Sequence, residues 1–370
     1  MDSSQSTLSE SVASTDLDSL WKKRTVEKRL SDYHREKSDD DTSDFLRTVF
    51  GHLPSAGKTN LASDIAGCED DEMLRKLAMS IDTGLLRPVQ ALGGTPAPLV
   101  LSPRLGLDDS IENLASEDTP SASRSEQSRL RKACLERDNH RCVVSGFWDP
   151  QHPDLPDGAT ECDLEGAHIL PYSIGEYDER SEDSRYRHCA IWVNIHRYFP
   201  DLRARMNFTS EQINDVTNVI TLCEGLHKQF GLFHFVFEPT DTINKYKVKT
   251  FKSFRNVYSS WLPVDRLVRF TAHNVNIALP NPVLLEFHAA IGNILNLTAR
   301  GETIEKLRHD FGEMGGSVLA QDGSTNVGDL LSISKLSLLA PPTRYQEEET
   351  PKPASRHLRT ELPGAENKAP

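Results

Sequence analysis

The sequence predicts an α+β fold, and three stretches of its apolar pattern support this prediction. Apolar residues recur at helical spacing within residues 44–88, and a second helical face follows the Asn281-Pro282 pair. Residues 232–238 are an aromatic and β-branched run, and an alternating run at 245–251 follows a turn at 239–241, which together predict a β-hairpin. No internal repeat is visible, so we expect one body of mixed helices and strands.

The N-terminal third changes character twice. The first 43 residues are rich in Ser, Asp and Lys, and their only apolar cluster is Leu17–Trp21, too little to offset the entropy lost on ordering, so a disordered tail is expected for 1–43. Two apolar stripes within 44–88 predict a small helical element, which Gly84 is expected to end. Residues 89–126 pass through Gly-Gly-Thr-Pro-Ala-Pro and a Ser- and acid-rich tract, which is typical of a linker.

The apolar content is high from about residue 127 to about 311, which marks the main folded domain. Within it, Ser128–Arg137 has the pattern of a short helix, and Cys142–Val144 has that of a strand broken by a Ser-Gly pair. Pro282 is well placed in the first turn of the last predicted helix. Residues 312–370 are rich first in Gly and Ser, then in Pro and Glu, and are expected to be disordered.

Charge and hydropathy limit the classes of function. The chain carries 42 Lys and Arg against 55 Asp and Glu, and the net charge of −13 excludes a protein that coats nucleic acid by charge alone. No stretch approaches the ~20 apolar residues of a membrane span, so no membrane partner is expected. The first ten residues, MDSSQSTLSE, are polar and acidic, unlike a secretory signal. We therefore expect an intracellular protein, nuclear or cytoplasmic.

The cysteines and two motifs are not expected to form a metal or nucleotide site. None of the six cysteines belongs to a C-x-x-C pair, and an intracellular chain would keep them reduced. His188, Cys189 and His196 match no zinc-ligand spacing. Gly57-Lys58-Thr59 resembles the end of a phosphate-binding loop, but His52 stands where that motif needs a glycine. A helix-ending loop with a surface lysine is expected there, and an NTPase is excluded.

Three segments of the main domain together indicate a catalytic site. In Ala167–Pro171, His168 stands between small and apolar residues; Asn218 opens the apolar run to Leu222; and His227 follows within Cys223–Phe230. Taken singly, each residue has an ordinary explanation. His168 could be a core or edge histidine, Asn218 a turn residue or helix cap, and His227 half-buried on an amphipathic helix. Their order and context favour a shared site.

Together with Cys142–Gly146, these segments resemble the HNH endonuclease family over roughly residues 129–237. The resemblance is to a branch common in fungal proteins, with the motifs C-x-[VL]-[ST]-G, A-H-I-x-P and N-x-[IL]-x-L-x4-H-x2-F, and the chain matches each of them. It implies a ββα-metal (His-Me finger) nuclease core with added helices and a hairpin. An insertion at about 172–210 carries Trp192 and Tyr198, which are expected to pack against this core.

The resemblance implies hydrolysis of phosphodiester bonds in DNA by three residues. His168 would be the general base, because an imidazole with a pKa of about 6.5 can take a proton from water near neutral pH. Asn218 would hold His168 in one tautomer and orientation through the other ring nitrogen. His227 would be a ligand of a divalent metal ion, Mg²⁺, Mn²⁺ or Zn²⁺, that stabilises the negative charge on the phosphate and the leaving oxygen.

Two positions depart from the family pattern. Ala167 stands where many members have an Asp or His as a second metal ligand, so another acid has to supply that ligand. Glu165 is the nearest candidate, since it shares the Ala167 face of a regular strand, and Asp163 would share it too; either acid could instead be a solvated surface residue. Gly231 replaces the Asp that commonly follows the Phe, which predicts the loss of a supporting contact.

The charge distribution suggests where a phosphate backbone could bind. Lys245, Lys247 and Lys249 share one parity of the predicted strand and therefore one face, although the solvated face of a hairpin explains them equally well. Residues 241–270 carry a net charge of +5, and residues 151–180 a net charge of −7. The charges are therefore unevenly distributed within one domain. The carboxylates are expected to hold a cation beside His227, and the basic hairpin is expected to bind the phosphates.

Three hypotheses remain open from the sequence. The leading one is a metal-dependent HNH nuclease that acts on DNA. The second is an inactive HNH-fold module that serves for protein interaction, supported by Gly231, the acidic insertion and the negative charge. The third is a regulatory domain that binds a metal through His227 and neighbouring acids and cleaves nothing. The sequence identifies no protein partner.

Overall fold

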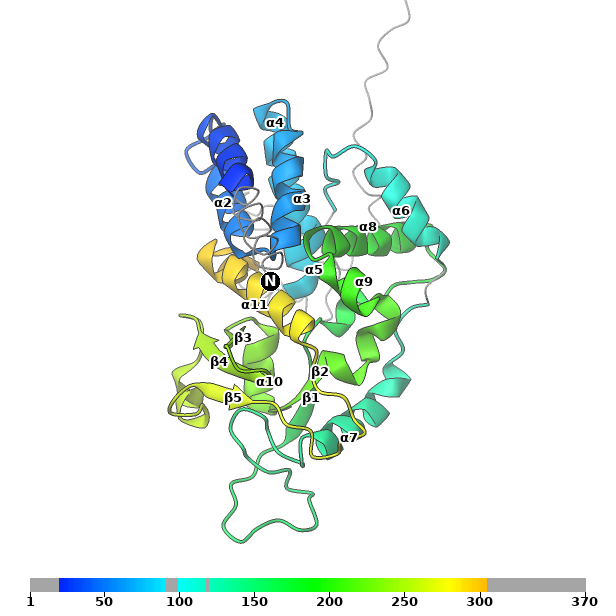
Figure 1. The fold of residues 1–370 in the computed structure, drawn as a ribbon. Helices are drawn as coiled ribbons and strands as arrows, with labels where there is room; N and C mark the ends of the chain where they lie inside the picture. The colour runs from blue at the N-terminus through cyan, green and yellow to red at the C-terminus, as the bar shows by residue number, and fades with distance from the viewer. Residues whose placement is uncertain (1–19, 91–98, 118–119, 305–370) are drawn as a thin grey trace, which may run out of the picture.

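The computed structural model describes residues 20–90, 99–117 and 120–304 (Figure 1). The predicted α+β class is confirmed, because helices surround two small antiparallel sheets. Figure 1 shows the N-terminal helices at one end of the molecule and the sheets at the other, with the helix α11 (Pro282–Leu297) between them. Within the described residues, no helix has the length and apolarity that a bilayer span requires.

The N-terminal part is helical from residue 20 onward. A helix over residues 20–31 precedes α2 (Thr42–His52), α3 (Ser55–Ala66), α4 (Asp71–Ile81), the π-helical turn η1 (Asp82–Leu86) and α5 (Arg87–Gln90). The predicted disorder of 1–43 is therefore wrong for residues 20–43, and residues 1–19 lie outside the described part. Val26 and Leu30, one helical turn apart, are buried in the main core, which gives this helix its stabilising contacts. Leu20 and Trp21 are exposed.

Two glycines lie where α8 (Glu182–Tyr198) packs closely against the N-terminal helices. Gly84 does not end a helix as expected, because the chain continues through η1 into α5; a Cβ there would lie 2.3 Å from Asn194 Nδ2. Gly57 lies in the first turn of α3 rather than in the expected helix-ending loop, and a Cβ there would lie 2.0 Å from Tyr198 O. Both positions exclude larger side chains because a neighbouring segment fills that space.

The predicted linker over 89–126 contains a packed helix, α6 (Leu107–Ser116). Leu107 and Ile111 lie one turn apart on this helix and are buried together with Leu99 against α8. The linker prediction is therefore wrong for this stretch, because the apolar residues among the acids recur at helical spacing. Residues 91–98 and 118–119, like 305–370, lie outside the described residues, so the expected disorder of 312–370 stays a prediction.

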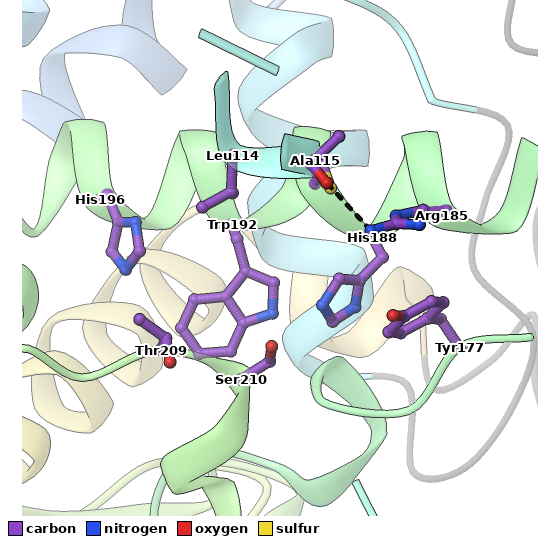
Figure 2. Close-up of a pocket in the computed structure, with 10 residues that line it drawn as sticks. Leu114, Ala115, Tyr177, Arg185, His188, Trp192, His196, Thr209 and Ser210 are labelled. Atoms are coloured by element: carbon purple, nitrogen blue, oxygen red, sulfur yellow. Dashed lines mark hydrogen bonds between the residues drawn. The ribbon is translucent and has the colours of Figure 1, made fainter. Parts of the chain in front are cut away.

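The insertion within the main domain forms α8 and α9 (Asp201–Met206). Trp192 is 1% exposed, and its Nε1 donates to Ile174 O in the short helix η3 (Tyr172–Ile174), so it packs against the main domain as expected. Tyr198 is also buried, but its hydroxyl donates to Asp64 of α3 instead. Figure 2 shows His188 and His196 on either side of Trp192, around a cavity of about 20 Å³. Such a cavity has room for about one water molecule.

The main domain begins with α7 (Gln127–Arg137), close to the predicted bounds. Its elements are then β1 (Leu164–His168), β2 (Val219–Cys223), α10 (Glu224–Gly231), β3 (Phe235–Pro239), β4 (Lys245–Thr250), β5 (Leu267–Arg269) and α11, with the 3-10 turns η2 (Arg124–Glu126), η4 (Ser210–Asn214), η5 (Val216–Asn218) and η6 (Asn256–Trp261). The predicted hairpin is confirmed as β3–β4, to which β5 adds a third strand. The predicted strand at Cys142–Val144 is a turn, in which Val143 N donates to Thr221 O.

One disulfide bond, Cys162–Cys223, links the two strands at the Leu164–Cys223 end of the β1–β2 ladder. The expectation that all six cysteines are free is therefore wrong. Antiparallel pairing places Leu164 opposite Cys223, so Cys162, two residues earlier, comes within bonding distance of Cys223 although 61 residues separate the two along the chain. The other four cysteines are free and buried.

Candidate functional site

The site is built on a ββα unit made of β1, β2 and α10. The two strands run antiparallel, with His168 opposite Val219, and α10 begins directly after β2 (Figure 1). Ile220, Leu222, Leu226 and Phe230 are all 0% exposed, so one side of the unit is held by the core. The apolar anchor between Asn218 and His227 thus orients the strand and the helix relative to each other.

A buried ion pair fixes the start of β2 against α7. The Arg137 side chain is 0% exposed, and its Nε donates to Asp138 Oδ1 at 2.7 Å. The same guanidinium donates to Val216 O and Val219 O, while Asp138 Oδ2 accepts from Thr221 N. Most polar atoms of the Arg137–Asp138 pair therefore have a hydrogen-bond partner on β2 or on the residues just before it. Such a network requires a defined backbone position, because a missing partner would leave a buried charge unpaired.

A cavity of about 610 Å³ opens beside β1. Its polar lining residues come from α7, β1 with the residues around it, and α10: Gln127, Arg131, Asp163, Glu165, His168, Tyr172, Ser173 and His227. It therefore brings together His168, His227 and Glu165, three of the residues that the sequence singled out, with the alternative acid Asp163. Asn218 is not among the lining residues.

His168 lies at the end of β1 with one ring nitrogen engaged. Its Nε2 is 3.3 Å from Asn214 Oδ1, and the Asn214 amide nitrogen donates to Ser123 O. Because the amide oxygen can only accept, Nε2 carries the proton, and Nδ1 is left with the lone pair. Burial lowers the pKa of His168 to about 4, with a smaller contribution from His227 in the same direction, against the Asn214 hydrogen bond. The ring is therefore neutral at pH 7.

Asn218 acts on the backbone beside His168 and does not contact its ring. The Asn218 side chain is fully buried; its Oδ1 accepts from Leu170 N at 2.8 Å, and its Nδ2 donates to Leu170 O and Ile213 O. The expected bond to the other ring nitrogen of His168 is made by Asn214 instead. Asn218 holds the segment that follows His168, because both polar groups of Leu170 are bonded to one rigid amide.

His227 and Glu165 face each other across the gap between α10 and β1. His227 Nδ1 lies 2.5 Å from Glu165 Oε2, and the two side chains are 36% and 46% exposed. An imidazole and a carboxylate so close to each other, both open to the cavity, form a donor pair suited to a cation. The structure thus brings together the two residues that the sequence proposed as ligands.

Residues 142–238 match the family model of HNH endonucleases. This segment is an HNH endonuclease domain. The match begins at Cys142 and ends at Glu238 in β3, so it includes the whole ββα unit and the α8–α9 insertion. No curated protein and no solved structure matches the chain. The family implies nuclease chemistry on nucleic acid.

The HNH domain offers an incomplete donor set for a metal. Within the described ranges, no group of three or more His, Cys, Asp or Glu side chains is arranged to hold an ion. Glu165 and His227 supply two donors, and Asp163 lines the same cavity with an exposed side chain. Two protein donors suit an ion that keeps several water ligands, such as Mg²⁺, better than a closed four-ligand zinc site. The residues present therefore fit a partly hydrated divalent cation.

Two polar residues of the HNH domain were not anticipated from the sequence. Asn214, which holds the His168 ring, lies 46 residues from it along the chain. Arg131 lines the cavity from α7, and its Nε and Nη2 donate to Leu164 O at 3.1 and 2.9 Å. Among the described residues, none accepts a hydrogen bond from Arg131 Nη1, so this nitrogen can donate to a ligand. No local pattern marks either residue, because each acquires its role through a distant contact.

The predicted lysine row lies away from the cavity. Lys245, Lys247 and Lys249 alternate with buried residues on β4, as their parity predicts. Lys249 Nζ donates to Glu238 Oε1 and Asn293 Oδ1, so its charge is used within the protein. None of the three lysines is among the residues that line the cavity. The row stays a prediction for binding of the phosphate backbone, and Arg131 lines the cavity instead.

Proposed function

We propose that the chain is a metal-dependent HNH endonuclease that hydrolyses phosphodiester bonds in DNA. The observation that carries this proposal is the convergence of three side chains on one cavity: His168 with an unprotonated nitrogen, and the Glu165–His227 pair beside it. Hydrolysis of a phosphodiester needs a base for water and a cation for the developing charge. The cavity supplies groups of both kinds within the family fold.

His168 serves as the general base through Nδ1. Asn214 holds the ring by accepting a hydrogen bond from Nε2–H, which leaves Nδ1 as the nitrogen that takes a proton from water. Asn218 holds the backbone at Leu170 and so restricts the movement of His168. A bound phosphodiester anion near the ring would favour the imidazolium form and raise the pKa of His168 from its low value in the ligand-free protein.

The metal ion and the phosphate of the substrate would be bound by Glu165, His227 and Arg131. The carboxylate and the imidazole would bind a divalent cation, which neutralises charge on the phosphate and on the leaving oxygen. Arg131 Nη1 donates to a non-bridging phosphate oxygen, while Leu164 O fixes the orientation of the guanidinium.

The test is nicking of supercoiled plasmid with Mg²⁺, Mn²⁺ or Zn²⁺ by the wild type and by His168→Ala. We expect the wild type to nick with at least one of these metals, and the variant to lose about 100-fold or more of the rate, as is typical for loss of a general base. His273→Ala is the matched control, because His273 is exposed and does not line the cavity. Nicking that persists in His168→Ala would exclude His168 as the base.

The second candidate function is an inactive HNH module. It is favoured by Gly231, which lines the cavity where the family commonly has an Asp, and by the absence of a third metal-binding side chain among the described residues. Isothermal titration with Mn²⁺ separates the alternatives. Metal binding that Glu165→Gln and His227→Ala abolish, without nicking, would indicate a metal-binding regulatory domain. No binding and no nicking would indicate an interaction module.

A further inference from the structure

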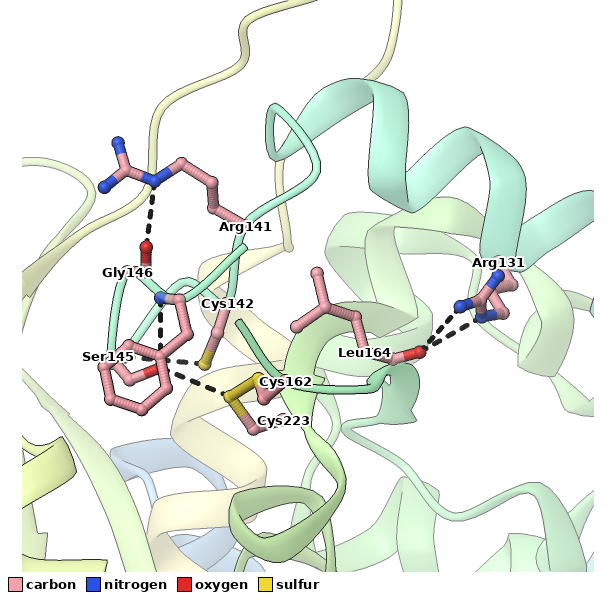
Figure 3. The surroundings of a disulfide bond; sticks show 9 residues. Arg131, Arg141, Cys142, Ser145, Gly146, Cys162, Leu164 and Cys223 are labelled. Atoms are coloured by element: carbon pink, nitrogen blue, oxygen red, sulfur yellow. Dashed lines mark hydrogen bonds between the residues drawn. A yellow bond between two sulfur atoms is a disulfide. The ribbon is translucent and has the colours of Figure 1, made fainter. Parts of the chain in front are cut away.

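Three cysteines surround the end of the ββα unit opposite His168. Cys162 and Cys223 form the disulfide, and the free thiol of Cys142 lies beside them (Figure 3). Ser145 connects the three: its hydroxyl is 3.3 Å from Cys223 Sγ, and its backbone N donates to Cys142 Sγ at 3.4 Å. Formation or loss of a disulfide bond at this position would therefore change the constraints on β1, β2 and α10, which carry the site.

The disulfide lies next to both members of the Glu165–His227 pair. Cys162 precedes Glu165 by three residues on the way into β1, and Cys223 is the N-cap of α10, one helical turn before His227. The same two segments are also joined by the Leu164–Cys223 pairing of the β1–β2 ladder and by the hydrogen bond from Glu224 N to Asp163 O, at 3.1 Å. The covalent bond therefore limits how far α10 can move away from β1.

The two sulfur atoms differ in access and in chemistry. Cys162 is half-buried, whereas Cys223 is 0% exposed, so Cys162 is the more accessible of the two to a thiol in solution. When that bond breaks, Cys223 leaves as a thiolate at the N-terminus of α10, within hydrogen-bonding reach of the Ser145 hydroxyl. A helix N-terminus and a hydroxyl donor both favour a thiolate and make it a better leaving group.

The free cysteines elsewhere have surroundings that suppress such chemistry. Burial raises the pKa of Cys134 to about 12 and that of Cys68 to about 11. Both thiols therefore stay protonated at neutral pH, and a protonated thiol is a poor nucleophile. The bonded pair instead combines a half-buried cysteine with a leaving group at a helix N-terminus beside a hydroxyl.

We propose that Cys162–Cys223 is a reversible thiol-exchange site that controls the geometry of the Glu165–His227 pair. The inference rests on the proposed nuclease function. A low-molecular-weight thiol such as glutathione attacks Cys162 Sγ, and the electrons of the S–S bond go to Cys223, which takes a proton. A second thiol then attacks the mixed disulfide and releases Cys162 as a thiol. Two thiols are oxidised to one small-molecule disulfide, and the protein gains two electrons and two protons; oxidation runs through the reverse steps.

Reduction loosens the end of the ladder that carries both proposed metal ligands. We expect the amides of α10 to exchange hydrogen at least tenfold faster in the reduced protein, because one covalent constraint is lost while the Glu224–Asp163 bond remains. The nicking rate should fall on the order of tenfold, as small displacements of positioned groups reduce catalysis. The Asn214–His168 contact lies at the other end of β1 and should be less affected.

The experiment equilibrates the full chain with glutathione and its disulfide at several ratios, then blocks free thiols with N-ethylmaleimide. Mass spectrometry reports the Cys162 and Cys223 thiols, hydrogen exchange reports α10, and plasmid nicking reports the rate. Cys162→Ser should reproduce the reduced state in oxidising buffer. Cys68→Ser is the control, because Cys68 is free and lies in the N-terminal helices. Ser145→Ala should slow reduction roughly threefold for each pKa unit that the leaving thiolate gains.

The measurements distinguish failure of the thiol-exchange site from failure of the nuclease function. A pair that does not form at any glutathione ratio, or whose reduction leaves the exchange of α10 unchanged, would overturn the proposal. Exchange that rises throughout the molecule, α4 included, would also overturn it, because the bond would then serve stability only. If no form nicks DNA but α10 responds to reduction, the exchange site stands and the nuclease function fails.

Discussion

Asp64 and Glu165 each pair with a basic side chain far away in the sequence, yet their surroundings are opposite. Asp64 accepts from Arg197 at 2.5 and 3.0 Å and from the Tyr198 hydroxyl at 3.1 Å, and its side chain is 3% exposed. Glu165 meets His227 at 2.5 Å, but both side chains are more than one-third exposed and line a cavity. The carboxylate of the first pair is buried, although Asp64 and Arg197 also line a cavity of about 330 Å³, whereas both side chains of the second pair are partly exposed.

The difference separates polar contacts that hold the fold from contacts that can change partners. The carboxylate of Asp64 accepts three hydrogen bonds from two residues, so any exchange would leave buried groups unsatisfied. The Glu165–His227 pair can give up its mutual bond for a cation, because solvent and ligands reach both groups. A short distance alone therefore does not distinguish the two pairs; the exposure of both side chains does.

The largest effect on stability is expected from Asp64→Ala. The change leaves the Arg197 guanidinium without its main partner and the 0% exposed Tyr198 hydroxyl without an acceptor. We expect a loss of roughly 3 kcal/mol in the free energy of unfolding, measured by urea denaturation, with the nicking rate of the folded protein unchanged. Glu112→Ala, at an exposed acid on α6, is the control. A loss below 1 kcal/mol would mean that the pair is not a structural contact.

The next largest effect concerns stability in acid. His288 on α11 stacks between Phe230 and Phe233, and burial lowers its pKa from 6.5 to about 3. Between these values the unfolded chain binds a proton that the folded chain does not, so stability falls as the pH drops below 6.5. The expected cost at pH 5 is roughly 2 kcal/mol.

His288→Gln should remove this part of the acid sensitivity, since glutamine does not titrate. The measurement is the free energy of unfolding at pH 7 and pH 5 for the wild type and the variant, with the exposed His273→Gln as control. His168 and His188 have pKa values lowered to about 4 by burial, and they contribute in the same window. A wild type equally stable at both pH values would contradict the prediction.

A smaller effect, on DNA binding, is expected from Arg131→Ala, in the cavity that the Glu165–His227 pair also lines. Removing the guanidinium should weaken binding of a short DNA duplex about tenfold in EDTA and lower the slope of log K against log salt by about one. Arg129→Ala is a matched control on the same helix, because Arg129 is exposed and does not line the cavity. Equal effects of the two changes would remove Arg131 from the phosphate site.

The smallest effect, also on DNA affinity, is expected from Lys247→Ala. Lys247 is exposed on β4 and does not line the cavity, so any phosphate it contacts lies away from the cleaved bond. We expect DNA affinity to change less than about twofold at physiological salt, because one exposed charge is strongly screened. Fluorescence anisotropy with a labelled duplex measures it. A loss as large as that of Arg131→Ala would restore the lysine row as the main phosphate contact.

Local patterns predicted the regular elements of the main domain well. The apolar face after Asn281 and the proline at 282 predicted α11, where the Asn281 side chain indeed accepts from Val283 N. The alternation at 245–251 predicted β4, and the order of His168, Asn218 and His227 predicted the family. The predictions of α11 and β4 depend on residues within a turn or a strand of each other, so they follow directly from the sequence.

The errors of prediction occurred where burial depends on distant segments. Residues 20–31 and α6 are polar in composition, but a few apolar side chains such as Val26 and Ile111 meet helices elsewhere in the chain. Gly84 marks a close approach to α8 rather than a helix end. Composition counts residues and cannot show which of them face a neighbour.

By itself, the sequence determined the class of chemistry, because a histidine, an asparagine and a second histidine in this order belong to the HNH pattern. The tertiary structure alone decided how those residues are supported. It placed Asn214 on the His168 ring, turned Asn218 to the backbone, brought Glu165 to His227 and joined Cys162 to Cys223. These contacts span 46 to 62 residues, and only the path of the folded chain determines which distant side chains meet.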